Sequence, residues 1–183
     1  MIMARLKRET QALHGATEAR MPVMDPALTR AAYAGLLAQM YALISPLETR
    51  LLALGLPASL SLEDRLKTPA LRRDLRALGV AVPTERADWL PGDVPAGLGS
   101  LYVLEGGTLG GQIISRHLEP RLGLGAGAGL AYFSSYGLQT GPMWKRFAEA
   151  MTREVGPEVG DAVVEGARET FLAFGRALDT RPD

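Results

Sequence analysis

The chain contains no cysteine among its 183 residues. Disulfide bridges, thiolate metal ligands and a cysteine nucleophile are therefore excluded. Histidine is almost as scarce, since His14 and His117 are the two in the chain. Any chemistry that needs an imidazole must use one of these two residues.

An excess of charge of one sign is also lacking. Twenty lysine and arginine residues balance twenty aspartate and glutamate residues, so the formal net charge is zero. Nucleic acids and anionic membrane surfaces attract proteins with a basic excess, so neither is expected as a partner. No apolar run reaches transmembrane length, and residues 1–8 lack the apolar core of a signal peptide. We therefore expect a cytoplasmic protein.

Apolar residues make up 47% of the chain, which is enough for one sizeable core. They recur at the three- and four-residue spacing that is typical of amphipathic helices, and no strand pattern is found. The expected fold is an all-α single domain over residues 1–183, with a frayed tail from about residue 179. The spacing predicts helices over residues 3–19, 29–54, 68–79 and 98–118, a short helix after Ser61, a helix from Thr140, and a last helix ending near residue 178.

Prolines and capping residues predict where these helices bend or end. Pro46 is expected to kink or divide the second helix, and Pro120 to close the helix that contains residues 98–118. Ser61 and Thr140 are expected to cap the helices that follow them. Residues 80–97 are expected to form an irregular loop.

Four glycines interrupt the helical pattern of residues 102–118, at positions 106, 107, 110 and 111. Each costs about 1 kcal/mol relative to alanine in a helix interior. Gly106 and Gly110 are four residues apart, as are Gly107 and Gly111, so each pair aligns along the helix axis. The glycines therefore serve either close packing against another helix, or a bare and bendable face toward a ligand.

His14 has a second ionisable residue on its own helical face, because Glu18 follows four residues later. A histidine that binds a metal usually has a partner on its other nitrogen, and Glu18 is placed to be that partner. Lys7 lies two turns earlier on the same side, where a cation can meet an anionic group of a ligand. Ordinary solvated charges at Lys7 and Glu18 fit the same spacing.

His117 is the rival ligand, since it follows Gly110 by seven residues and falls near its face. Its predicted place at a helix end, beside Arg116, is typical of a histidine that interacts with terminal carbonyls. We therefore favour His14 as the ligand.

Taken together, residues 6–14, 102–112, 132–137 and 143–147 resemble the biliverdin-producing heme oxygenases. The resemblance is closest to the short bacterial branch associated with bacteriophytochromes, and it runs from about residue 4 to residue 175. It implies an all-α, heme oxygenase-like helical bundle. In this bundle heme lies between the first helix and a kinked, glycine-rich distal helix.

The resemblance also implies a role for individual residues. His14 is the proximal ligand of the heme iron, with Glu18 beside it. Gly106, Gly107, Gly110 and Gly111 form the distal helix over the porphyrin. The remaining implied heme contacts are Lys7 and Lys145 for the propionates, Arg146 as the alternative to Lys145, and Tyr102 at the edge of the cofactor.

The implied reaction is the oxidative opening of heme b, which is both cofactor and substrate. O2 is the co-substrate, and the products are biliverdin, CO and ferrous iron. Nothing in the chain resembles a nicotinamide or flavin fold, so electrons must come from a separate donor of the ferredoxin or reductase type. A bacteriophytochrome that receives biliverdin is a further candidate partner.

Two positions depart from the family pattern. Many members carry an aspartate where this chain has Gly107, so proton delivery must use another group, for which Thr108, Gln112, Arg116 and water are candidates. Some relatives carry a basic residue where this chain has Glu149, so the binding of the propionates is expected to differ from that in these relatives. Two alternative functions remain: a heme carrier or sensor that does not degrade heme, and a helical interaction partner of a photoreceptor.

Overall fold

The computed structural model describes residues 1–86, 88–125 and 127–179. Within these residues the regular elements are helices, and the bridges at Gly125 are isolated pairs outside any strand. The predicted all-α class is confirmed. The α-helices are α1 (Ile2–Arg20), α2 (Arg30–Leu54), α3 (Thr68–Ala77), α4 (Val94–Leu122), α5 (Ala131–Ser134), α6 (Thr140–Glu154) and α7 (Gly160–Asp179). The 3-10 turns are η1 (Pro22–Met24), η2 (Ala58–Leu60), η3 (Leu62–Arg65) and η4 (Gly137–Gln139).

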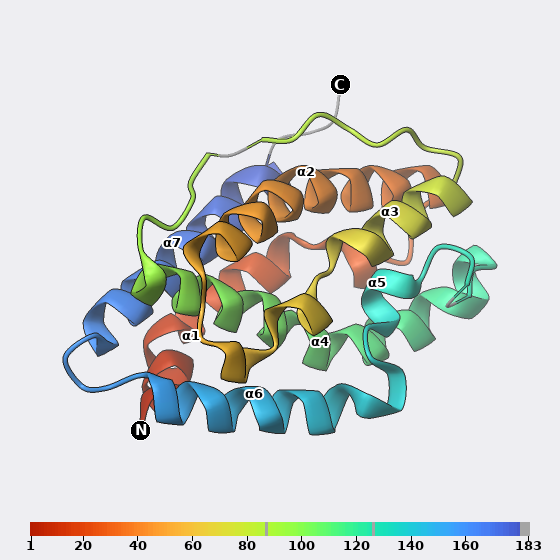
Figure 1. Ribbon diagram of the computed structural model, residues 1–183. Coiled ribbons are helices and arrows are strands. Elements are labelled where there is room, and N and C mark those ends of the chain that lie inside the picture. Colours follow the sequence, from red (N-terminus) through yellow and green to blue (C-terminus); the bar gives the residue numbers. More distant parts are fainter. Residues whose placement is uncertain (87, 126, 180–183) are drawn as a thin grey trace.

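Helix α7 is the element on which α1 and α4 both pack. Figure 1 shows α2 along the top, α4 across the middle and α6 along the bottom, with α1 and α4 running in the same direction. Helix α6 also packs on both α1 and α4. None of the helices in the described part of the chain is long and apolar enough to cross a membrane.

The backbones of α4 and α7 approach each other closely at two glycines. A Cβ atom on Gly99 would collide with the Val163 carbonyl, and one on Gly166 would collide with the backbone of Ala96. The Thr170 hydroxyl donates to Ser100 Oγ over 3.0 Å at the same interface. Because backbone atoms meet there, the first half of α4 is held rigidly on α7.

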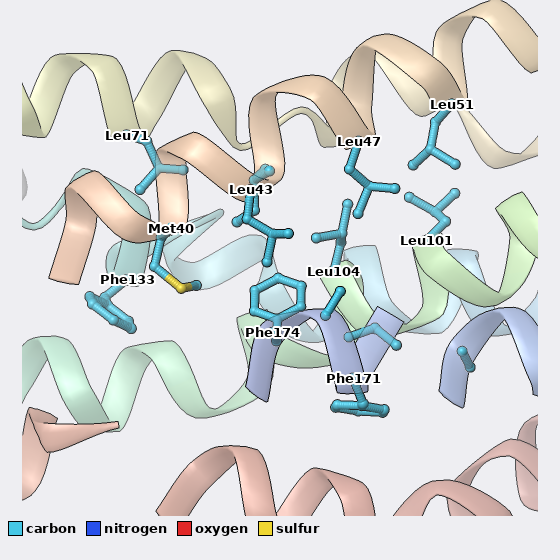
Figure 2. Close-up of a cluster of buried hydrophobic side chains, with 14 of the residues drawn as sticks. Met40, Leu43, Leu47, Leu51, Leu71, Leu101, Leu104, Phe133, Phe171 and Phe174 are labelled. Carbon is cyan, nitrogen blue, oxygen red and sulfur yellow. The ribbon is translucent and has the colours of Figure 1, made fainter. Parts of the chain in front are cut away.

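The core lies between α2 and α3 on one side and α4 and α7 on the other, as Figure 2 shows. Each of its large apolar side chains contributes about 1.5–3 kcal/mol when it is fully buried. Phe171 lies at the edge of this core that faces α1 (Figure 2). The core side chains labelled there are Met40, Leu43, Leu47, Leu51, Leu71, Leu101, Leu104, Phe133, Phe171 and Phe174.

Pro46 does not divide the second helix, because α2 is continuous from Arg30 to Leu54. A proline removes the hydrogen bond to the carbonyl four residues earlier, which here is that of Ala42. The backbone N–H of Arg86 donates to this freed carbonyl over 2.9 Å. The long-range bond satisfies the acceptor, and buried neighbours such as Ile44 and Leu47 hold the helix together.

Several predicted boundaries are wrong. Ser61 makes no capping bond and has a left-handed backbone, with φ 48°, before the 3-10 turn η3. Pro120 lies inside α4, which ends at Leu122 and is followed by the cap residue Gly123 in the left-handed conformation.

The start of α4 also differs from the prediction. Asp93 caps α4 by accepting from Ala96 N, so the predicted loop over residues 80–97 is shorter. Thr140 is the first residue of α6 and not its N-cap, and its hydroxyl donates to the Gly137 carbonyl. The predicted frayed tail falls mostly on residues 180–183, outside the described residues.

Candidate functional site

The four glycines of α4 divide into two kinds. A Cβ atom added at Gly106, Gly107 or Gly110 would meet no other atom within 4 Å. A Cβ atom at Gly111 would collide with the carbonyl of Phe133 in α5. Three of the glycines therefore leave bare backbone facing open space, and the fourth lets another element pack closely.

Exposed apolar side chains lie beside the bare backbone. Leu109 is 44% exposed and Ile113 is 66% exposed, although both are large hydrophobic residues. At about 100° per residue, they fall on the same side of α4 as Gly106 and Gly110. We call this surface the glycine face and define it as Gly106, Gly107, Leu109, Gly110 and Ile113. A flat apolar ligand fits such a surface, because it combines bare backbone at the three glycines with apolar side chains at Leu109 and Ile113.

His14 lies on the accessible side of α1, with its side chain 52% exposed. Its Nε2 atom is 3.3 Å from Oε1 of Glu18, as the four-residue spacing predicts. The ring of Phe171 in α7 lies 5.7 Å from the imidazole, centre to centre. The carboxylate and the aromatic ring thus orient an imidazole that solvent can reach.

Tyr102 is where α4 meets both α1 and α6. Burial raises the pKa of its phenol, and a hydrogen bond with the Thr10 side chain of α1 opposes this shift. Its ring also lies 6.1 Å from that of Trp144 in α6, centre to centre. Thr10 precedes His14 by one helical turn, and Tyr102 precedes Gly106 by one turn. Because α1 and α4 run in the same direction (Figure 1), the residues one turn after Thr10 and Tyr102 lie toward the same end of the two helices.

The predicted basic residues lie on the two helices that pack beside this contact. Lys7 is on α1, whereas Lys145 and Arg146 are on α6, and all three are exposed. Lys145 directly follows Trp144, the neighbour of Tyr102. Arg146 Nη2 lies 2.7 Å from Met143 Sδ. These side chains supply positive charge at the surface of α1 and α6.

His117 differs from His14 in both position and surroundings. Helix α4 continues to Leu122, so the predicted place of His117 at a helix terminus is wrong. Its Nε2 atom is buried and has no hydrogen-bond partner within the described part of the chain. An exposed imidazole paired with a carboxylate is the better metal ligand, which favours His14.

Two of the proton-delivery candidates are engaged in structural hydrogen bonds. The Thr108 hydroxyl is buried and donates to the Glu105 carbonyl over 2.7 Å. The Gln112 amide donates to the carbonyl of Gly137 and to Thr140 Oγ1. Arg116 is exposed.

Sequence reasoning missed a buried polar cluster directly behind the glycines. Glu105 is fully buried and bonds to Arg65, Lys67 and Tyr136, which come from distant parts of the chain. Burial lowers the pKa of Lys67, and the nearby Glu105 carboxylate opposes this shift. The sequence feature that could have revealed this cluster was a glutamate, Glu105, inside an otherwise apolar stretch of helix. Its partners were invisible because they lie 31 to 40 residues away.

Comparisons with known proteins agree on one family. The heme oxygenase family model matches residues 1–180. The heme oxygenase of Xanthomonas campestris pv. campestris is 34% identical over 129 residues, which cover 64% of this chain and 72% of that protein.

Two solved structures share the fold. The NO- and CO-bound heme oxygenase from Neisseria meningitidis gives a TM-score of 0.84 at 22% identity, covering 100% of this chain and 97% of that one. The heme oxygenase from Leptospira interrogans gives 0.76 at 18% identity, covering 97% and 98%. At these identities the likeness concerns the all-α fold.

Proposed function

The chain belongs to the heme oxygenase family and is a heme-degrading oxidoreductase, and from this premise we propose that heme lies between His14 and the glycine face of α4. One observation carries this placement. An accessible imidazole on α1 and a bare stretch of α4 lie on two helices that both pack on α6 and on α7. We propose Gly106, Gly107, Gly110 and Gly111 as the distal segment, with Gly111 setting its packing on α5.

His14 is the proposed ligand of the heme iron. Oε1 of Glu18 lies 3.3 Å from Nε2 of His14, so a carboxylate accompanies the imidazole that would bind the iron. The nearby Glu18 carboxylate favours one orientation of the His14 ring. Phe171 supports the same orientation from the side of α7.

Cationic and apolar residues complete the proposed binding site. Lys7 and Lys145 pair with the propionates, Arg146 is the alternative to Lys145, and Tyr102 reaches the edge of the ring. Leu109 and Ile113 lose exposed apolar surface when the macrocycle covers them. The bare backbone leaves room for a small gas molecule, and glycines let the helix bend for product release.

When bound, heme supplies both the iron that activates O2 and the ring that is opened, and the proposed products are biliverdin, CO and ferrous iron. A separate protein of the ferredoxin or reductase type supplies the electrons. Gly107 provides no carboxylate for proton delivery, and Thr108 and Gln112 are held in structural bonds. We therefore assign proton delivery to solvent water, because an arginine such as Arg116 keeps its proton in proteins. A bacteriophytochrome that receives biliverdin is the proposed acceptor of the product.

A hemin titration of three proteins tests this proposal. The wild type is expected to give a histidine-ligated heme spectrum that decays to a bilin on addition of reductant and O2. His14→Ala is expected to lose both the native ligand and most of the turnover, whereas His117→Ala keeps both. If instead His117→Ala loses the ligand, the assigned histidine is wrong. A heme spectrum that persists under turnover conditions would indicate a carrier or sensor, and no heme spectrum at all would favour an interaction partner of a photoreceptor.

A further inference from the structure

The Glu105 cluster, which we define as Glu105, Arg65, Lys67 and Tyr136, is almost completely closed to solvent at its charged groups. The side chains of Glu105, Arg65 and Lys67 are 0%, 2% and 7% exposed. Lys67 Nζ donates to Glu105 Oε1 over 2.6 Å, and the Tyr136 hydroxyl donates to the same oxygen over 2.7 Å. Arg65 Nη1 donates to the other carboxylate oxygen. Both oxygens of one carboxylate are thus held by three side chains.

The two cations of the cluster are themselves fixed by other elements. Arg65 Nε donates to the Leu60 carbonyl over 2.6 Å, and its guanidinium lies 5.4 Å from the centre of the Phe147 ring in α6. The backbone N–H of Lys67 donates to the buried carboxylate of Glu48 in α2. Glu105 is therefore connected through its partners to η2, α2 and α6.

The charges balance, but the arrangement is a poor source of stability. Arg65 and Lys67 supply two positive charges, and Glu105 and Glu48 supply two negative charges. Burying ions costs several kcal/mol for each of them, and apolar replacements of such groups are often no less stable. Groups of this kind are better explained by the position that they impose on the chain.

That position is the start of the glycine segment. Glu105 directly precedes Gly106, and a Cβ atom added at Gly106, Gly107 or Gly110 would contact nothing outside its own helix. The same stretch of chain that supplies Tyr136 also contacts the far end of the segment, through Phe133 at Gly111 and Gly137 at Gln112. Residues 105–112 are thus fixed at both ends by contacts on the side of α4 that is opposite the glycine face.

We propose that the Glu105 cluster is a positioning site that sets the height and rotation of residues 106–110 over the heme plane, and thereby the carbon of the ring that is attacked. This inference rests on the proposed heme site. In this proposal the residues of the Glu105 cluster do not touch the heme ring. They act through the backbone of α4, which gets no such support from side chains on its glycine face.

Tyr136→Phe tests the inference with the least disturbance, since it removes one hydroxyl from the cluster. Tyr41→Phe is the matched control, because its hydroxyl accepts from Arg72 over 2.8 Å, away from α4. In the heme-free proteins, amide hydrogen exchange in residues 106–111 is expected to be about tenfold faster for Tyr136→Phe than for wild type, as the loss of a hydrogen bond to a charged group predicts. Tyr41→Phe is expected to exchange there at the wild-type rate.

The loaded proteins give the second measurement. For Tyr136→Phe, the C–O stretch of the ferrous carbonyl complex is expected to shift and broaden, and the distribution of biliverdin isomers to widen. Tyr41→Phe leaves both unchanged. Wild-type exchange rates and isomers in Tyr136→Phe, or equal effects in Tyr41→Phe, would overturn the inference. If the wild type fails to bind heme through His14, the proposed function fails, and the exchange rates still decide whether the cluster holds the segment.

Discussion

The two sides of α4 are built in opposite ways from neighbouring residues. On one side Gly106, Gly107 and Gly110 face open space, beside exposed apolar residues. On the other side Glu105 is fully buried among charged partners, and Gly111 touches the backbone of α5. Glycine thus has two uses within six residues. The comparison shows that the bare backbone on one side of α4 is accompanied by buried ionic and backbone contacts on the other side, which fix the position of the helix.

Removing the charge of Glu105 is expected to have the largest effect on stability. Glu105→Gln leaves Arg65 and Lys67 without their shared counter-charge in a buried place. We expect a loss of about 3–5 kcal/mol in the free energy of unfolding, measured by urea denaturation. Arg8→Gln, which changes a charge on the exposed side of α1, is the control and is expected to be near neutral. If Glu105→Gln is as stable as the wild type, the buried ion pairs of Glu105 do not hold this side of α4 in place.

The next test places the same methyl group on each side of α4. Gly111→Ala would press a Cβ atom into the Phe133 carbonyl, so backbone must shift, at a cost of about 1–3 kcal/mol in the free energy of unfolding. Thermal and urea denaturation of the purified variant measure this loss.

Gly107→Ala is expected to have the opposite sign. Its methyl group meets open space, and alanine favours a helix over glycine by about 1 kcal/mol, so the free energy of unfolding should rise by about that amount. Equal signs for the stability changes of Gly107→Ala and Gly111→Ala would remove the distinction between the two sides.

The smallest stability effect is expected at the exposed apolar rim of the glycine face. Ile113→Ser should change the free energy of unfolding by less than about 0.5 kcal/mol, since the side chain is mostly exposed. Its hemin affinity, measured by titration, should nevertheless drop several-fold, because apolar contact with the ring is lost. Leu52→Ser changes another exposed apolar residue, on α2, and should leave the affinity unchanged. Identical affinities for the two variants would place the ligand elsewhere.

Local features of the sequence predicted much of the fold and one contact within the proposed site. Helical spacing predicted the all-α class, and the four-residue step from His14 to Glu18 predicted the observed contact. Helix ends were less predictable. The Ala42 carbonyl freed by Pro46 is satisfied by Arg86, which lies far along the chain. Pro120 is accommodated two residues before the end of α4.

The sequence by itself determined which residues we propose for the chemistry: one histidine with a nearby glutamate on the first helix, and a cluster of glycines in a long helix. These follow from residue type and from spacing within a few turns. Only the tertiary structure decided which glycines are bare and which one is packed, and it revealed the charged partners of Glu105. The reason is physical, because the neighbour of a glycine and the partner of a buried charge come from segments that become adjacent only when the chain folds.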